Sequence, residues 1–249
     1  MKISAIIITK NEEENIEECL KTLSFVNEII LVDNDSKDET VKIAKNLGAK
    51  IFRVPGLDFS YLRNVGKEKA SFPWLLYIDG DERVTKELEK EITDIKSTGE
   101  YSAYSIERKN YYLGHLFPKN EEIVRLIKKD SLISWQGSLH ESPQVSGKIG
   151  KLDSYVLHHT HRDLTSMLNK TNEWSDIEAR LRFQSGHPQM IWWRFFRVTL
   201  TAFYNSYIRD EGWKVGVVGL IEGIYQAFSI FITYAKLWEL QNKNKKVSN

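Results

Sequence analysis

The stretch that decides the fold is Trp74-Leu75-Leu76-Tyr77-Ile78-Asp79-Gly80-Asp81-Glu82. Its apolar run predicts a strand that is covered on both faces, as in a parallel sheet. Two carboxylates, Asp79 and Asp81, follow where the strand ends, and Gly80 between them would let a phosphate or sugar approach the backbone. Hard cations such as Mg²⁺ or Mn²⁺ bind such oxygen ligands together with substrate phosphates. Asp-Gly-Asp is also a common turn sequence, so the neighbouring segments must distinguish a metal-binding role from an ordinary turn.

The segments before this strand alternate between strand and helix patterns. Apolar runs predict three more strands, over residues 3–9, 28–32 and 50–54. Helical spacing predicts helices over residues 16–23, 36–47 and 61–70, the second one starting at a capping box from Ser36 to Glu39. Such alternation predicts an α/β fold with a mostly parallel sheet, whose ligands bind beyond the carboxyl ends of the strands.

Polar residues gather at those strand ends. Thr9, Asn11 and Glu12 follow the first strand, and Asp33 ends the second, so all of them are expected on one rim with Asp79. Asp33 would accept a hydrogen bond from a nucleotide base or ribose, or serve as a turn residue before the next helix. Arg63 would reach a diphosphate as a forked donor, or point into solvent from its helix.

The second half of the chain has a looser pattern. Strands are expected over residues 101–108, 123–127 and 155–158, followed by an amphipathic helix from Leu164 to Leu181. His158, His159 and His161 are spaced too tightly for all three to share one metal, because neighbouring strand residues face opposite sides.

Composition narrows the class of protein. The chain has 249 residues, a net charge of +1 and one cysteine, Cys19. The charge argues against a nucleic-acid partner, and a single cysteine excludes an intramolecular disulfide and a cysteine-based zinc site. The apolar run from Ile3 is too short for a signal sequence, so a cytoplasmic location is expected.

The C-terminal third changes character near His187, and a boundary is expected there, between residues 1–186 and 187–249. Aromatic residues interleave with Arg194, Arg197 and Arg209, which is typical of a helix in a membrane interface. The apolar stretch from Val215 to Ala235 is long enough to span a bilayer, but a half-immersed helical hairpin is favoured. A buried helix in a soluble dimer is the alternative, so a homo-oligomer stays open.

The ordered motifs resemble glycosyltransferase family 2. They are Ile6-Ile7-Ile8-Thr9-Lys10-Asn11-Glu12-Glu13, Ile30-Leu31-Val32-Asp33-Asn34-Asp35, Arg63-Asn64-Val65-Gly66 and Ile78-Asp79-Gly80-Asp81-Glu82. Later segments resemble its subgroup of bacterial lipopolysaccharide-core β-1,4-glucosyltransferases: Val124-Arg125-Leu126, Leu139-His140-Glu141, Leu157-His158-His159 and Tyr234-Ala235-Lys236-Leu237-Trp238-Glu239. Residues 117–122 lack the aromatic Gly/Trp/Tyr-Pro run that the subgroup is expected to carry before Arg125, so the acceptor stays open.

The resemblance implies a GT-A fold, a UDP-sugar donor such as UDP-glucose, a divalent metal and inversion at the anomeric carbon. It implies that Asp81 binds the metal, that Asp79 lies by the ribose and metal, and that Asp33 lies by the base. Glu141 would be the catalytic base, with His140 as the next candidate, and His158 would complete the metal shell. The acceptor would be a lipid-linked or cell-surface glycan such as lipopolysaccharide core, reached at the inner face of the cell membrane.

Two other functions are conceivable for such a fold. A sugar nucleotidyltransferase needs a glycine-rich basic loop after the first strand, but that place holds Thr9 to Glu14, which is acidic and lacks glycine. A non-catalytic membrane-bound scaffold would have lost its metal or base residues, whereas Asp79, Asp81 and Glu141 are all present.

Overall fold

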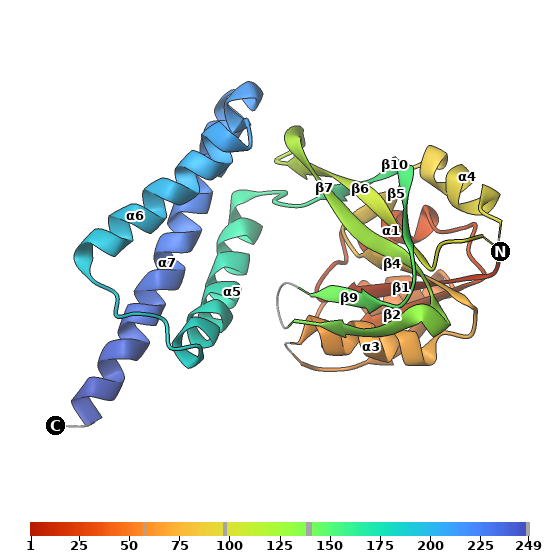
Figure 1. The fold of residues 1–249 in the computed structure, drawn as a ribbon, viewed down its shortest axis with the longest axis horizontal. Coiled ribbons are helices and arrows are strands. Elements are labelled where there is room, and N and C mark those ends of the chain that lie inside the picture. The colour runs from red at the N-terminus through yellow and green to blue at the C-terminus, as the bar shows by residue number, and fades with distance from the viewer. Residues whose placement is uncertain (57, 97–98, 138–140, 248–249) are drawn as a thin grey trace. The chain divides into compact units, whose positions relative to one another are not determined.

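The computed structural model describes residues 1–56, 58–96, 99–137 and 141–247, which form two compact units (Figure 1). The first, here called the sheet unit, comprises Met1–Lys109 and Asn120–His158. The second, the helical unit, comprises Asn110–Lys119 and His159–Asn249.

The sheet unit is built on one large sheet and a small hairpin. The strands are β1 (Ile3–Thr9), β2 (Glu28–Asp33), β3 (Lys50–Arg53), β4 (Trp74–Asp79), β5 (Glu82–Val84), β6 (Ala103–Tyr112), β7 (His115–Lys128), β8 (Leu132–Gln136), β9 (Ser142–Val145) and β10 (Ile149–His159). Eight of them form a sheet in the order β3-β2-β1-β4-β7-β6-β10-β5, and β8 pairs with β9. The predicted α/β class is therefore confirmed.

The first four strands in this order are parallel, and their register brings the predicted rim together. Thr9 is opposite Asp33 in the β1–β2 ladder, and Ile8 is opposite Asp79 in the β1–β4 ladder. The expectation that three polar clusters share the carboxyl edge is confirmed. On the far side of β4 the ladders turn antiparallel, with β7 against β4 and β5 against β10.

Four helices and a short 3-10 turn complete the sheet unit. They are α1 (Ile16–Lys21), α2 (Thr40–Asn46), α3 (Phe59–Lys69), α4 (Lys86–Asp94) and η1 (Lys129–Ser131). The helix α3 lies close on β1 because residue 66 is glycine: a Cβ there would stand 2.3 Å from Ile6 Cγ2. Two buried clusters, one containing Ile7 and Leu76 and the other Ile6 and Leu75, show that both faces of the strands are covered.

The predicted capping box at Ser36 is wrong. The helix α2 starts only at Thr40, and Ser36 Oγ instead accepts a hydrogen bond from the Asn11 amide at 2.9 Å. Thr40 Oγ1 likewise accepts from the Glu12 amide at 2.8 Å. These hydroxyls stabilise the loop after β1. A capping pattern considers only residues three positions apart, so it cannot predict hydrogen bonds to such a distant loop.

The cysteine lies beneath the rim. Cys19 is fully buried on α1, and its thiol donates to the backbone carbonyl of Asp79 at 3.5 Å. Burial raises the pKa of this thiol far above its ordinary value.

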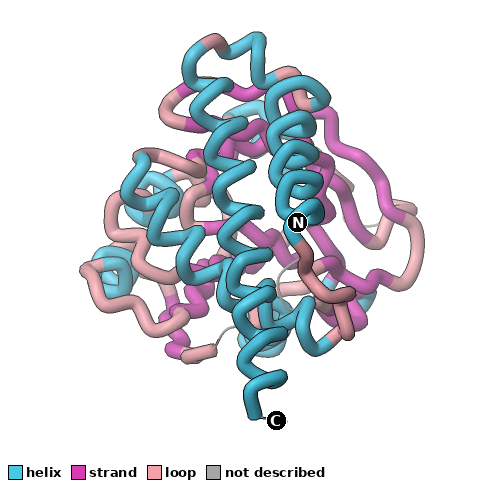
Figure 2. The backbone as a smooth tube through the Cα atoms, turned by 90° about the vertical axis from the view of Figure 1, so that its left-hand side faces the viewer, coloured by secondary structure: helices cyan, strands magenta, loops and turns pink. Residues whose placement is uncertain are grey.

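The helical unit contains α5 (Leu164–Gln184), α6 (Trp192–Phe203), the π-helical segment η2 (Tyr204–Arg209), the 3-10 turn η3 (Gly212–Val215) and α7 (Val217–Val247). The tube view in Figure 2 shows the long helices of this unit beside one another. The turn between β6 and β7 also belongs to this unit, since Tyr112 stacks on His161 with ring centroids 4.9 Å apart and Lys119 pairs with Asp210 at 2.9 Å.

The helix α7 packs between α5 and α6. On one side Thr171 Oγ1 donates to the Tyr225 hydroxyl at 2.8 Å, and on the other Phe195 packs on Phe231 with centroids 5.7 Å apart. At Gly219 the helix α7 lies very close to the turn η3, because a Cβ there would stand 1.7 Å from the Gly212 carbonyl oxygen. Since α5 packs on α7, the two compact units divide at His158–His159, whereas the sequence pattern placed the division near residue 187.

One helix within the described residues is long and apolar enough to cross a membrane, namely α7 over Val217–Lys243. That statement rests on length and composition alone, and the core helices of soluble proteins can satisfy it equally well.

Candidate active site

Asp79, the last residue of β4, lies at the centre of a buried ionic network. Its Oδ1 accepts from Arg63 Nη2 at 2.9 Å and its Oδ2 accepts from Arg125 Nη2 at 2.6 Å. The helix α3 supplies Arg63, and β7 supplies Arg125, so the carboxylate is gripped from two elements. Burial opposes ionisation of Asp79, but Arg125, Arg63 and Arg108 outweigh it and hold the pKa of this carboxyl well below its usual range.

Glu82 completes the network behind Asp79. It is fully buried, and its Oε2 accepts from the Asp79 amide at 2.9 Å. Its Oε1 accepts from Arg125 at 3.3 Å and from Arg108 at 3.4 Å. A buried carboxylate with these partners fixes the turn that presents Asp81, because each of its oxygens is tied to a different strand.

Arg63 joins this network to Glu141. Its Nε and Nη2 donate to Glu141 Oε1 at 2.9 and 2.7 Å, and the same Nη2 reaches Asp79. The guanidinium lies over the rings of Trp135 and Tyr77, 4.8 and 5.9 Å from their centroids. One forked cation therefore holds two carboxylates that are 62 positions apart in the chain, in a geometry that a point charge could not reproduce.

Asp81 and His158 form the second pair of the site. His158 Nε2 lies 3.3 Å from Asp81 Oδ2, and the β5–β10 ladder places His158 opposite Glu82. Burial by itself would lower the pKa of His158, but the Asp81 carboxylate outweighs it, so the pKa of this histidine lies above its ordinary value. A carboxylate and an imidazole that converge in this way suit a divalent cation whose other ligands come from the substrate.

The described residues contain no group of three or more histidine, cysteine, aspartate or glutamate side chains arranged around one metal position. Asp79, predicted as a further ligand, uses both carboxylate oxygens to accept from arginines. The donor set that fits a cation is therefore Asp81 with His158.

The loop after β1 is tied to the loop after β2. Asn11 adopts a positive φ of 55°, and its Oδ1 accepts from the Lys37 amide at 2.8 Å. Glu12 accepts from Asn15 Nδ2 at 2.6 Å and packs against the turn at Gly80, where a Cβ would stand 3.1 Å from Glu12 Cγ. A side chain at position 80 would therefore crowd Glu12, in addition to the ligand approach that the position of Gly80 suggested.

Thr9 and Asp33 are buried at the ends of their strands. The hydroxyl of Thr9 is a buried polar atom without a hydrogen-bond partner among the described residues. Asp33 is fully buried, and both of its oxygens accept from the Ser36 amide at 3.3 Å. Arg53 approaches Asp33 at 3.9 Å. The Asp33 carboxylate is therefore oriented by the loop that follows it.

The structure brings most of the sequence-predicted residues to one region of the sheet unit. His140 lies outside the described residues. No role was predicted from the sequence for Arg108, Arg125 or Trp135. A signal existed for Arg125, because it is the one charged residue in the apolar run Ile123-Val124-Arg125-Leu126-Ile127, and a buried strand tolerates a charge only when it is paired.

Comparison with known proteins adds independent information. A family model described as "Glycosyl transferase family 2" matches residues 4–151. An uncharacterised glycosyltransferase of Rickettsia typhi is 30% identical over 272 residues, covering 99% of this chain and 90% of that protein. A lipopolysaccharide core biosynthesis glycosyltransferase, LpsC of Rhizobium meliloti, is 26% identical and covers 96% of this chain and 93% of that protein.

A solved structure with a similar chain path is that of S. aureus TarS residues 1–349 in complex with UDP-GlcNAc. Its TM-score is 0.49 at 16% identity, with 93% of this chain and 80% of that chain covered.

Proposed function

This chain belongs to glycosyl transferase family 2, and from that premise we propose that it is an inverting, metal-dependent enzyme that transfers glucose from UDP-glucose to a glycan acceptor. The observation that carries the proposal is the Arg63 bridge, which holds Glu141 beside Asp79 at the carboxyl edge of the sheet. The bridge puts a candidate base next to the carboxylate expected at the donor. Thr9, Asn11, Glu12, Asp33 and Gly80 would complete the nucleotide-sugar site around them.

Glu141 would act as the general base. Both bonds from Arg63 end on its Oε1, so Oε2 is the oxygen that would take the proton of the acceptor hydroxyl. The acceptor oxygen then attacks the anomeric carbon, and the bond from that carbon to the diphosphate oxygen breaks on the opposite face. Attack opposite the leaving group inverts the configuration, and a positioned base contributes about 10²–10⁴-fold to such a step.

Asp81 and His158 would hold the divalent metal, Mg²⁺ or Mn²⁺. When bound, this ion would neutralise the charge that develops on the diphosphate leaving group. Asp79 would lie beside the metal and the ribose, and its depressed pKa keeps it ionised at neutral pH. Asp33, oriented by the Ser36 amide, would accept from the nucleoside.

The acceptor is proposed to be a lipid-linked or cell-surface glycan such as the lipopolysaccharide core, reached at the inner face of the cell membrane. The support is the similarity, over nearly the whole chain, to LpsC of Rhizobium meliloti, a lipopolysaccharide core biosynthesis glycosyltransferase. An apolar helix long enough to enter a bilayer is consistent with such an acceptor.

The direct test is calorimetric titration of the purified chain with a panel of nucleotide sugars, in Mn²⁺ and again in EDTA. Metal-dependent binding of UDP-glucose, tighter than of the other sugars, is expected. A folded sample that binds no nucleotide sugar in the presence of metal would contradict the reaction and favour a non-catalytic scaffold.

The role of Glu141 is tested separately by Glu141→Gln, which should keep donor binding and lose turnover about 10²-fold or more. The matched control is Glu100→Gln, since Glu100 is exposed and pairs with Lys148 away from the site. Unchanged turnover in Glu141→Gln would move the base elsewhere, with His140 as the next candidate.

A further inference from the structure

One side of the helical unit presents a row of exposed apolar side chains along α6 and η2. The row consists of residues four positions apart, and they are between 45% and 75% exposed: Trp192, Phe196, Leu200, Tyr204 and Ile208. Residues at this spacing lie on one helix face. Monomeric soluble proteins seldom expose large side chains in such a continuous line, which marks an interaction surface.

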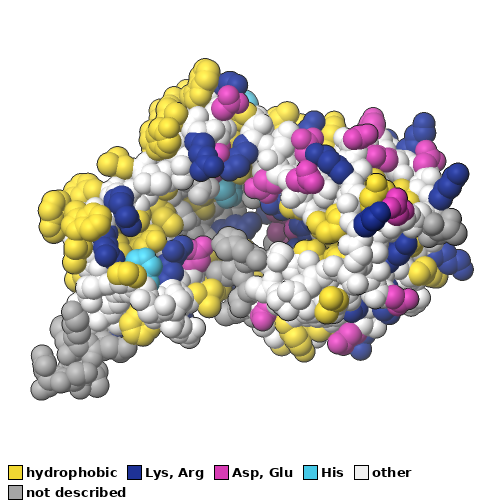
Figure 3. Space-filling model, in the orientation of Figure 1, with side chains coloured by type: hydrophobic (Ala, Val, Ile, Leu, Met, Phe, Trp, Pro, Cys, Tyr) yellow, Lys and Arg dark blue, Asp and Glu magenta, His cyan; other side chains and the backbone are white. Residues whose placement is uncertain are grey.

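A second row runs along α7. Its members recur at spacings of three, four and seven residues, and each is at least 40% exposed: Val217, Leu220, Ile224, Phe228, Phe231 and Trp238. The two rows belong to one helix pair, because Phe195 of α6 packs on Phe231 and Gly223 of α7 meets Phe203 closely. Figure 3 shows hydrophobic side chains gathered over these helices, with lysine and arginine among them.

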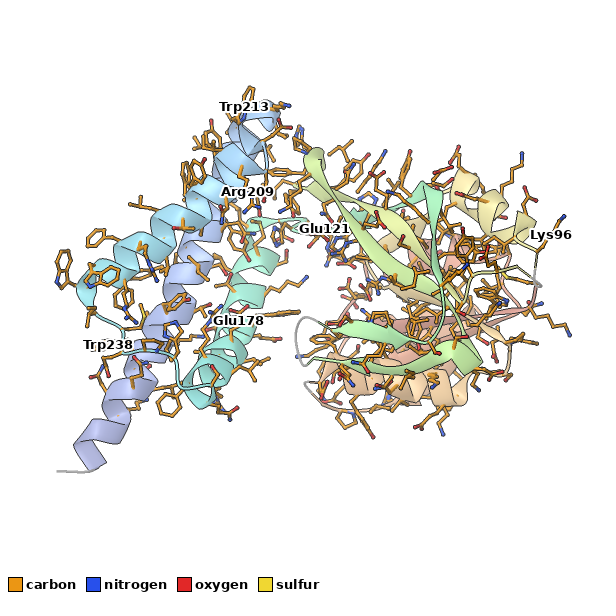
Figure 4. All side chains as sticks on the ribbon, viewed as in Figure 1. Lys96, Glu121, Glu178, Arg209, Trp213 and Trp238 are labelled. Carbon is orange, nitrogen blue, oxygen red and sulfur yellow. The ribbon has the colours of Figure 1, made fainter. Side chains whose placement is uncertain are left out.

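The charges beside these rows are basic. From Met190 to Arg209 the chain contains three arginines and no aspartate or glutamate. Arg194 and Arg197 lie 5.5 and 5.4 Å from the Trp193 ring centroid. Trp213 and Trp238 lie toward opposite ends of the helical unit (Figure 4). Tryptophan beside arginine matches the headgroup region of a bilayer, and the positive charge matches anionic lipid.

The opposite face of α7 is covered by protein, and it carries charged groups among its buried apolar residues. Glu222 is 1% exposed and lies 3.1 Å from His161 Nδ1. Lys236 donates to the Asn172 carbonyl at 2.8 Å and pairs with Asp176 at 2.9 Å. These partners come from α5 and the segment before it.

A spanning α7 is therefore incompatible with this packing. The helix α5 carries six charged residues in its 21 positions. If α7 crossed the bilayer with α5 attached, those charges would enter the hydrocarbon, which is strongly disfavoured. If α5 were stripped away, Lys236 would lose Asn172 and Asp176 in a medium with no water to replace them.

We infer that α6, η2 and α7 lie in the plane of one leaflet, with the two apolar rows immersed and the arginines contacting the headgroups of anionic phospholipids. The surface is called the leaflet face below, and it comprises the two rows together with Arg194, Arg197 and Arg209. This inference deepens the membrane location in the proposed function by naming the surface and its lipid partner.

Vesicle flotation of the full-length chain tests the leaflet face. The chain should float with vesicles of phosphatidylcholine mixed with phosphatidylglycerol, and several-fold less with phosphatidylcholine alone. Phe196→Glu should weaken binding to both by about tenfold or more, because an exposed phenyl ring no longer enters the apolar region. Arg197→Gln should weaken binding to the anionic vesicles alone, by about fivefold.

The matched control is Ile133→Glu, which replaces a side chain of β8 that is 62% exposed in the sheet unit. It should bind like the natural chain. Leu200→Glu serves as a second variant on the row, and circular dichroism checks that each variant is folded. Binding unaffected by both row variants would overturn the inference.

Alkaline carbonate extraction separates an in-plane helix from a spanning one. The chain should be released from membranes by the wash, since in-plane binding is reversible. Retention after the wash would overturn the in-plane arrangement. Sedimentation velocity tests whether a second copy of the chain covers this face instead of lipid. If Phe196→Glu turns a dimer into a monomer and leaves flotation unchanged, the face is a subunit interface.

Vesicle binding needs neither donor nor turnover. Its failure would leave the transfer reaction standing, and failure of nucleotide-sugar titration on the same sample would leave the leaflet face standing.

Discussion

The Arg63 bridge allows a sharp test of how the site works. Arg63 donates three hydrogen bonds, at 2.9 and 2.7 Å to Glu141 and at 2.9 Å to Asp79. Hydrogen bonds to charged groups contribute about 1.5–3 kcal/mol each. In Arg63→Lys the charge stays, but a single ammonium cannot reproduce the fork, so at least one bond is lost. We expect kcat to fall by roughly 10- to 100-fold, the equivalent of that loss in the transition state.

The informative experiment is a double-mutant cycle with Glu141→Gln, measured as UDP release from the donor that calorimetry identifies. If Arg63 acts by positioning Glu141, Arg63→Lys should lower kcat by less than about threefold once Glu141 is gone, because residues that act as one unit are not additive. The donor KM should change little.

An equal loss in both backgrounds, accompanied by a higher donor KM, would refute the positioning role. It would mean that Arg63 binds the diphosphate directly, as the sequence alone had suggested. Wild-type kcat together with a wild-type donor KM in Arg63→Lys would refute both roles. Glu100→Gln serves as the neutral background in a parallel cycle.

Three further predictions concern the metal, the acid stability and the packing of the sheet unit. Asp81→Asn should abolish Mn²⁺-dependent donor binding in calorimetry with the melting temperature nearly unchanged, and retained metal dependence would remove Asp81 from the metal site. Burial opposes ionisation of Glu28, but hydrogen bonds from Lys50, Ser4 and Ser71 outweigh it and lower its pKa from 4.5 to about 2. The ionised Glu28 carboxylate therefore stabilises the fold by about 3 kcal/mol above pH 4.5, and this stabilisation disappears as the pH falls through 2. In urea unfolding, Glu28→Gln should have a lower free energy of unfolding than the natural chain at pH 7, and the difference should shrink over this pH range. A difference that stays constant with pH would contradict the prediction. Gly66→Ala should lower the free energy of unfolding by about 1–3 kcal/mol, because the added methyl group would clash with Ile6. The control Gly56→Ala should leave the free energy of unfolding nearly unchanged, since a Cβ there would meet nothing within 4 Å. Equal effects of the two substitutions would contradict the packing argument.

The parallel half of the sheet could be predicted from the sequence because its strands are buried on both faces. Continuous apolar runs such as Ile3–Thr9 and Trp74–Ile78 are short and alternate with segments of helical spacing, which favours buried strands over buried helices. The position of Thr9, Asp33 and Asp79 on one edge then follows from topology, and the register confirms it.

The antiparallel part of the sheet and the first residues of the helices were harder to predict from the sequence. The strand β7 runs from His115 to Lys128, but only residues 123–127 are apolar enough to predict it. Ser36 carries a valid capping pattern, yet its hydroxyl is taken by Asn11, which is 25 residues away. Pairings over such distances leave no local trace in a single sequence.

The ionic network was missed for the same reason. The sequence predicts Arg63 either as a diphosphate donor or as a solvent-exposed helix residue, and nothing in its local sequence indicates that Asp79 and Glu141 accept hydrogen bonds from it. The position of Arg108 and Arg125 on adjacent strands depends on the order of β7 and β6 in the sheet, which hydrophobic patterns do not specify.

The buried position of Cys19 has a practical consequence for spectroscopy. It is the single cysteine of the chain, it is fully buried, and the raised pKa of its thiol leaves almost no thiolate at neutral pH. The natural chain is therefore silent toward thiol reagents while it stays folded. A cysteine introduced at Leu200 or Phe228 would be the only reactive thiol, so a nitroxide attached there could report immersion depth without any change to the residue beneath Asp79.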